Sequence, residues 1–272
     1  MKKLALCLLA LCVMAQAQAF DIVFGYTTGK YVSQDTGYGT FGLFTPYAKE
    51  DWLTFVDAKG YKFENNRWGA SGGIGGRFML PCYGAIGLNT YYDYLEGRFR
   101  GNFHQIGAGL EWLNPCWDIR LNGYFPIGKH SQFHRKCFFS NLGDGFMASR
   151  GQLEYVYDGA DLEGGLILWD WRNLTWYGAV GAYYYKAHEH KRHFYGSTAR
   201  LRMYYKDYVF LQVRVSHDRI YHTRVQGSLE VRIPLEAFLC LPRCGCQWFT
   251  QPVYREGVIM SERCCDWSWN WN

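Results

Sequence analysis

Three neighbouring residues in this chain of 272 residues have the side-chain types of a catalytic triad. Ser216, His217 and Asp218 could supply a nucleophile, a base and an orienting group. They lie in an extended segment, in which successive side chains point to opposite faces, so Ser216 and His217 cannot meet directly. We therefore predict that the protein is not an enzyme and has no catalytic residues.

Histidine and cysteine clusters could bind a metal. Residues 188–193 contain three histidines beside Lys191 and Arg192, which is more typical of a solvated basic loop than of a metal site. The cysteines of residues 240–246 have a Cys-x3-Cys-x-Cys spacing, which differs from the usual Cys-x2-Cys pairing of zinc sites. We expect no metal and no cofactor.

The N-terminus is typical of a secretory signal peptide. Two lysines precede an apolar run over residues 4–14, and Ala17-Gln18-Ala19 has the small-residue pattern of a cleavage site. We expect residues 1–19 to be removed on export. The mature chain then keeps 27 of the 29 basic side chains against 24 acidic ones, a net charge of +3. This charge excludes a strongly basic surface for nucleic acid.

Cysteines are numerous for an exported chain. Of the ten, Cys7 and Cys12 lie in the leader, and most of the others lie near predicted turns or in the C-terminal tail. Disulfides form and persist outside the cytoplasm, so pairing is expected. Bridges within the tail and links to other envelope proteins are both open, and the adjacent Cys264 and Cys265 favour intermolecular links. The disulfide candidates are Cys82, Cys116, Cys240, Cys244, Cys246, Cys264 and Cys265.

Polar and apolar side chains alternate along much of the chain, most clearly over residues 193–233. Alternation at every step gives a strand one apolar face and one polar face. No segment beyond the leader has the roughly 18 uninterrupted apolar residues of a membrane helix. We therefore predict an all-β fold, a transmembrane antiparallel β-barrel of the outer-membrane type.

About twelve strands are predicted, each near the roughly 9 to 11 residues that cross a bilayer at a tilt. The breaks between them alternate between short and long, as in outer-membrane barrels with tight periplasmic turns and longer exterior loops. A soluble sandwich or lipocalin-like barrel has no reason to place every long loop at one end. The predicted strands are 21–29, 38–47, 51–61, 67–79, 83–94, 101–112, 116–126, 160–169, 174–186, 193–205, 207–217 and 223–233.

The charged residues of these strands lie at the alternate positions that form the polar face. A charge at the lipid midplane would cost about 2–4 kcal/mol, so the polar face of each strand is predicted to point into the lumen. Aromatic residues gather at the short-turn ends, which predicts an interfacial girdle there. The expected lumen-facing residues are Asp118, Arg120, Asp161, Glu163, Arg200, Arg202, Arg214, Glu230 and Arg232.

Several of these segments resemble the β-domain of inverse autotransporters, the intimin and invasin family of outer-membrane proteins. The resemblance covers roughly residues 38–233 and rests on the order and spacing of a glycine-rich run and three short motifs. These are Gly69–Phe78, Asn89-x-x-x-Asp93, Gly107-x-Gly109-x-Glu111-Trp112 and Asn122-Gly123-Tyr124-x-Pro126. The resemblance implies a twelve-stranded barrel whose C-terminal linker threads the lumen and displays an adhesive passenger outside.

Residues 251–260 resemble the linker of that family, and only twelve residues follow, too few for an immunoglobulin-like passenger. The expected domains are a signal peptide over 1–19, a barrel over 20–238, and a Cys-rich tail over 239–272 without a passenger. The loop 127–159 is expected to extend as a hairpin above the membrane and to be the best candidate for surface contact.

The expected function is that of a surface anchor, translocator or structural envelope protein in the cell outer membrane, with a role in adhesion. The alternative is a narrow diffusion pore lined by the lumen charges. Expected partners are outer-membrane lipid, the barrel assembly machinery, other envelope proteins through disulfides, and a host surface ligand, but no nucleic acid.

Overall fold

A computed structural model describes residues 20–81, 83–99, 101–143, 146–187, 192–206, 208–234 and 248–271. Within these ranges the chain has strands, turns and irregular segments, and no helix is long and apolar enough to cross a membrane.

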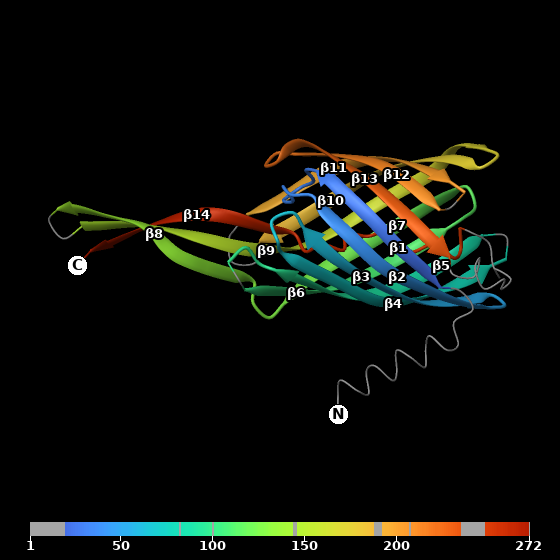
Figure 1. Ribbon diagram of the computed structural model, residues 1–272, viewed down its shortest axis with the longest axis horizontal. Coiled ribbons are helices and arrows are strands. Elements are labelled where there is room, and N and C mark those ends of the chain that lie inside the picture. The colour runs from blue at the N-terminus through green and yellow to red at the C-terminus, as the bar shows by residue number, and fades with distance from the viewer. Residues whose placement is uncertain are drawn as a thin grey trace, which may run out of the picture.

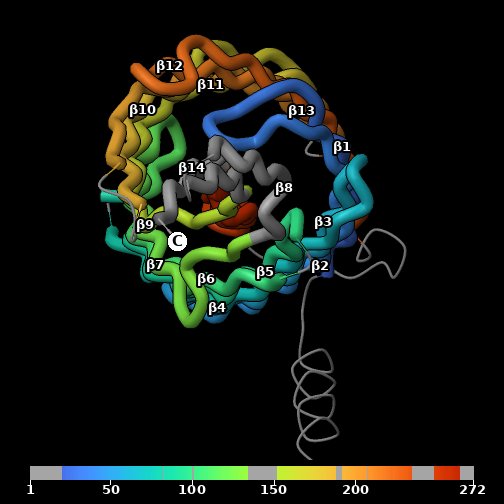
Figure 2. Tube along the Cα trace, turned by 90° about the vertical axis from the view of Figure 1, so that its left-hand side faces the viewer, coloured from blue at the N-terminus to red at the C-terminus, as the bar shows by residue number. Residues whose placement is uncertain are grey.

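Twelve of the 14 strands form a closed antiparallel barrel (Figures 1 and 2). Neighbours along the chain pair in order from β1 to β7 and from β9 to β13, and β7 pairs with β9. The pairing of β13 with β1, in which Asp21 lies opposite Pro234, closes the cylinder and leaves the barrel wall no free edge. The predicted transmembrane barrel of about twelve strands is therefore confirmed.

The barrel strands begin and end within a few residues of their predicted bounds, except for β9, which starts earlier. They are β1 (Asp21–Gly29), β2 (Tyr38–Lys49), β3 (Trp52–Phe63), β4 (Trp68–Leu80), β5 (Gly84–Glu96), β6 (Asn102–Leu113), β7 (Trp117–Ile127), β9 (Phe146–Trp171), β10 (Leu174–Ala187), β11 (His193–Tyr205), β12 (Val209–Asp218) and β13 (His222–Pro234).

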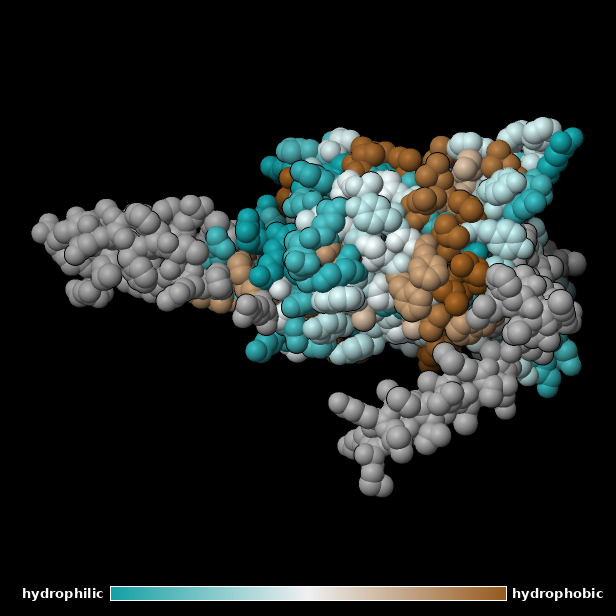
Figure 3. Space-filling model, viewed as in Figure 1, coloured by the Kyte–Doolittle hydropathy of each residue, from teal (hydrophilic) through white to brown (hydrophobic). Residues whose placement is uncertain are grey.

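Each strand buries alternate side chains in the lumen and turns the others outward. In β6, Phe103 and Gln105 are buried, whereas Ile106 and Leu110 are exposed. The outward set is largely apolar and includes Val180 at 69% exposure. On the face shown in Figure 3 its hydrophobic residues form a band over the half of the barrel near the short turns. Polar groups inside and apolar groups outside are the orientation that a bilayer requires.

Two rings of aromatic side chains bound this outward surface, as at the two interfaces of a membrane. The ring near the short turns, which was predicted, includes the exposed Tyr47, Trp52, Trp112, Trp169, Trp171, Tyr205 and Tyr208. The ring near the long loops was not predicted and includes the exposed Tyr26, Phe41, Tyr92, Phe125, Tyr184 and Tyr195.

A three-stranded sheet projects from the long-loop end of the barrel (Figure 1). Its centre is the first part of β9, which pairs with β8 (Ser131–Gly143) on one side and with β14 (Ser261–Trp271) on the other. The predicted hairpin within loop 127–159 is confirmed. The β14 strand was not predicted, although Trp267, Trp269 and Trp271 alternate with Ser268 and Asn270.

Candidate functional site in the barrel lumen

The C-terminal segment 248–260, which we call the plug, lies inside the ring of strands (Figure 2) and extends from the short-turn end to the long-loop end. At one end Trp248 lines a small cavity with the short turn 114–116. At the other end the Tyr157 backbone N–H donates to the Met260 carbonyl over 3.1 Å. The plug side chains Phe249, Val253, Val258, Ile259 and Met260 are all buried.

A twelve-stranded cylinder needs such a filling. A barrel of about eight strands is filled by its own side chains, and a wider one has room to spare. All three apolar clusters inside this barrel combine wall and plug residues: Phe249 and Val253 pack in one, Val258 and Ile259 in another, and Met260 in the third. The plug is therefore part of the hydrophobic core.

Arg77 holds the beginning of the plug. Its guanidinium donates to the backbone carbonyls of Phe249 and Gln251, both at 2.6 Å, and to Glu111 at 2.9 Å. The Arg77 side chain is only 1% exposed. A guanidinium so deeply buried must be paired, and it is satisfied here by one wall carboxylate and two plug carbonyls.

The middle of the plug binds both walls. Arg255 donates to the two carboxylate oxygens of Asp93 at 2.8 and 2.5 Å, and to Ser71 at 3.1 Å. Glu256 accepts from Arg214 at 2.8 Å, and its backbone N–H donates to the Tyr124 hydroxyl at 2.8 Å. Two-oxygen contacts between guanidinium and carboxylate fix direction as well as position.

One glycine of the Gly107-x-Gly109 motif makes room for this contact. A Cβ atom at Gly107 would lie 2.4 Å from Nη2 of Arg255. Any larger residue would therefore push the plug arginine out of its place beside Asp93. The motif that supports the family resemblance thus has a local role in seating the plug.

Opposite charges predominate on opposite walls of the lumen. The wall formed by β3 to β9 has more carboxylates, and the wall formed by β11 to β13 has more guanidinium groups. The first wall carries Asp57, Asp93, Glu111, Asp118, Asp161 and Glu163 with Lys59, Arg77 and Arg120; the second carries Arg200, Arg202, Arg214 and Arg232 with Asp218 and Glu230. Arg255 binds the first wall and Glu256 the second.

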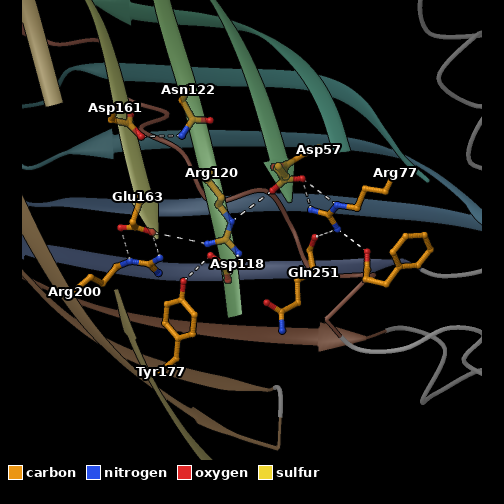
Figure 4. A network of polar contacts seen from close by, with 12 residues as sticks. Asp57, Arg77, Asp118, Arg120, Asn122, Asp161, Glu163, Tyr177, Arg200 and Gln251 are labelled. Carbon is orange, nitrogen blue, oxygen red and sulfur yellow. Dashed lines mark hydrogen bonds and ion pairs between the residues drawn. The ribbon is translucent and has the colours of Figure 1, made fainter. Parts of the chain in front are cut away.

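A chain of ion pairs crosses the acidic wall toward the basic one (Figure 4). Arg120 lies 3.6 Å from Glu111, 3.0 Å from Asp118 and 3.9 Å from Glu163. Glu163 in turn binds Arg200. Because each buried charge has a neighbour of the opposite sign, the network offsets the cost of removing these groups from water.

The plug residue Tyr254 separates two like charges. Arg200 and Arg214 are directly opposite each other on β11 and β12, a pairing that is unfavourable by itself. The Arg200 guanidinium lies 3.4 Å from the centre of the Tyr254 ring, and Arg214 donates to the Tyr254 hydroxyl at 3.2 Å. Cation–π contact and Glu256 together stabilise this arrangement.

The structure places the nine expected lumen-facing residues on the inner wall. Asp118, Arg120, Glu163, Arg200, Arg214 and Arg232 are buried. Asp161 accepts from Asn122 and Tyr124. Arg202 and Glu230 line a cavity against the plug. Sequence reasoning did not assign roles to Arg77, Arg255 and Glu256, because their partners lie far away in the chain.

Two carboxylates fasten the projecting sheet to the barrel mouth. Glu262 of β14 accepts from the hydroxyls of Tyr155, Tyr157 and Tyr221 and pairs with Arg192 at 2.9 Å. Burial, and then the Glu262 charge, raises the pKa of Tyr221 above its ordinary value.

On β9, the Glu154 side chain is fully buried and accepts from the Arg98 backbone N–H at 2.6 Å and from Ser261 at 3.1 Å. It also lies 3.9 Å from the Arg67 guanidinium. The base of the projecting sheet is thus bound to two loops of the rim and to the start of β14.

The remaining chemical candidates are separated or lie outside the described residues. Ser216 is buried and His217 is exposed, so the two face opposite sides as expected. Cys116 is an exposed free thiol. Outside the description lie the leader 1–19, the histidines at 188 and 190, Cys82, Cys240, Cys244 and Cys246, and the side chains of Cys264 and Cys265.

An outward apolar band, a charged lumen and a lumenal plug define an outer-membrane β-barrel. Residues 32–161 match the family "Inverse autotransporter, beta-domain". The predicted resemblance is thereby confirmed over these residues, which are similar to the β-domain of inverse autotransporters.

Relatives with curated descriptions match part of this barrel. Intimin of Citrobacter freundii is 31% identical over 101 residues, which are 37% of this chain and 10% of that protein. Intimin of Escherichia coli O157:H7 is 30% identical over the same share of each chain. The chain thus spans about a tenth of the length of these relatives in the match.

A solved structure from a study of the in-meso crystallization of membrane proteins has the same fold. It superposes with a TM-score of 0.61 at 16% sequence identity, covering 90% of this chain and 100% of that one.

Proposed function

We propose that this protein is a surface anchor that passes its own C-terminal segment through its barrel and holds it outside the cell. The path of residues 248–260 through the lumen is the observation that supports this most directly. A chain that enters at the short turns and leaves at the long loops has crossed the membrane within its own barrel. The resemblance to inverse autotransporters supports the same path of the chain, from the short turns to the long loops.

The projecting sheet is the part that we propose to act at the surface. It consists of β8, β14 and the first part of β9, and the contacts of Glu154 and Glu262 hold its base against the rim. A base held on two sides would present the sheet in one direction rather than as a loose tail. We propose that it contacts a ligand outside the cell, which is the adhesive role expected of this family.

Protease treatment of intact cells tests this proposal. The projecting sheet should be cut on intact cells, and a protease site inserted into the short turn 172–173 should be cut only after the cells are opened. The inserted site is the control for membrane integrity. Protection of the sheet on intact cells, with cleavage after lysis, would contradict the proposed topology.

A second candidate function is a diffusion pore, which the separation of charge across the lumen favours. Opposed acidic and basic walls create a transverse field that would select small charged solutes. Planar-bilayer conductance separates the two functions. Steady conductance with the tail present supports the pore, whereas conductance that appears only after deletion of residues 239–272 supports the plugged anchor.

A further inference from the structure

We propose that the lumen holds a small inorganic anion of the halide type between the basic wall and the plug. The site is a cavity of about 130 Å³ whose lining includes Lys59, Arg202, Glu230, Arg232 and plug residues 251–258. This site is independent of surface display and goes beyond the proposed function.

The charges around the cavity do not balance. Arg232 lies 3.4 Å from Glu230, the carboxylate of its own strand. Arg202 makes its side-chain hydrogen bond to the neutral Gln212, at 2.9 Å, and forms no ion pair with any described carboxylate. Lys59 and Asp57 form a separate pair at 3.2 Å. Arg214 is paired with Glu256, and Arg255 with Asp93. Among the described residues of the lining, Arg202 is therefore left as a positive charge without a carboxylate partner.

A buried donor also lacks an acceptor at this place. The Arg232 side chain is 6% exposed, and its Nε–H is buried without a hydrogen-bond partner among the described residues. A buried N–H of a charged group that finds no acceptor costs free energy comparable to a lost hydrogen bond or more. An anion in the cavity would accept from this group and would neutralise the excess charge.

The size and lining of the cavity restrict the ligand. About 130 Å³ is larger than a water site and well below the roughly 300 Å³ at which organic-ligand pockets begin. The space exists partly because Gly25 stands between Thr40 and Glu230 in the sheet and adds no side chain. Hydroxyls of Thr40 and Ser228 complete the polar lining. One unmatched positive charge fits a monovalent anion.

The plug forms one side of this cavity, so anion binding and plug retention should be linked. A ligand that binds only when both sides are present stabilises the state that has both. The anion would therefore favour the threaded state.

Thermal unfolding of the full-length protein in detergent tests the site. Chloride is raised at constant ionic strength with sodium gluconate as the replacement salt, because gluconate is too large for the cavity. The expected result for the unchanged protein is a saturable rise of the unfolding midpoint. Arg202→Gln and Arg232→Gln should lose this rise, and Arg219→Gln, an exposed loop arginine, should keep it.

Glu230→Gln provides a test of the opposite sign. Removing this carboxylate adds a second unmatched positive charge, so half-saturation should occur at a several-fold lower chloride concentration. If the arginines had only a structural role, Glu230→Gln would not make the unfolding midpoint more sensitive to chloride. If Arg232→Gln fails to fold, Arg202→Gln and Glu230→Gln still decide the question.

Crystals grown in sodium bromide give a direct readout. An anomalous peak within hydrogen-bond distance of Arg202 and Arg232 supports the site. Absence of that peak, or an equal chloride response in the Arg202→Gln, Glu230→Gln and unchanged proteins, would overturn the proposal.

Discussion

The Arg255 guanidinium and the Glu256 carboxylate are adjacent in the chain but bind opposite walls of the lumen, Asp93 at 2.5 Å and Arg214 at 2.8 Å. Each plug charge meets the wall of opposite sign. This alternation reflects the extended backbone of the plug, in which successive side chains point in opposite directions. Charge therefore determines which way the plug is turned, as well as whether it stays.

Exchanging the two charges should release the plug. The double variant Arg255→Glu with Glu256→Arg keeps the net charge and places like charges beside Asp93 and Arg214. Breaking one buried ion pair costs about 3–5 kcal/mol, so the plugged state should lose most of its population. Planar-bilayer recordings should show conductance similar to that after deletion of residues 239–272. The control is Arg263→Gln, an exposed position, which should stay closed. A closed double variant would contradict the proposed lock.

Loss of the Glu262 carboxylate should loosen β14 at the barrel mouth. Glu262→Ala removes the acceptor of three tyrosine hydroxyls and the partner of Arg192. Hydrogen bonds to a charged group contribute about 1.5–3 kcal/mol, which corresponds to roughly 10- to 100-fold more frequent local opening. Limited proteolysis of β14 should accelerate accordingly. Arg263→Gln next to it should leave the rate unchanged, and an unaltered rate in Glu262→Ala would refute the clamp.

Alkaline pH should weaken the same contact. The folded pKa of Tyr221 is raised by burial and by Glu262, so folding favours the neutral hydroxyl. The stability that the neutral Tyr221 hydroxyl contributes is fully present below about pH 10, the pKa of tyrosine in the unfolded chain. It is lost as pH rises from there through the higher pKa of the folded state. Proteolysis of β14 by an alkali-tolerant protease should therefore accelerate above about pH 10. Tyr221→Phe, which has no proton to lose, should show a smaller pH dependence; an identical pH profile would count against this assignment.

The outward face can be tested with a charge placed at two depths. Val180 lies outward in β10 and is 69% exposed, whereas Tyr195 belongs to the ring near the long loops. Val180→Arg should lower the free energy of unfolding by about 2–4 kcal/mol in lipid, and Tyr195→Arg by about 0–1 kcal/mol. Denaturant titration in lipid vesicles measures both. Equal effects would mean that the hydrophobic band does not mark the bilayer centre.

The strands could be predicted from the sequence because their pattern is local. A bilayer outside and water-accessible polar groups inside impose alternation at every residue, and turns interrupt it at regular intervals. Strand bounds such as 174–186 against the observed Leu174–Ala187 therefore follow closely. The same local pattern identifies the strand positions that face the lumen, among them Arg200 and Arg214.

The lumen contacts could not be predicted in the same way. Arg77 meets Phe249 and Arg255 meets Asp93 across more than 150 positions of sequence, and alternation gives no information about such partners. The ring near the long loops and the β14 strand were missed for a related reason: short aromatic patterns are ambiguous until a neighbouring strand is known.

The 26-residue strand β9 continues without a break from the barrel wall into the projecting sheet, where β14 runs antiparallel to it over Ser261–Trp271. A pull at the far end of β14 along its axis would load this whole ladder of hydrogen bonds at once, in shear, instead of opening it bond by bond. Tension would then pass directly into the membrane-embedded cylinder and into the threaded segment beneath. A ladder loaded in shear would resist such a pull better than one opened from its end.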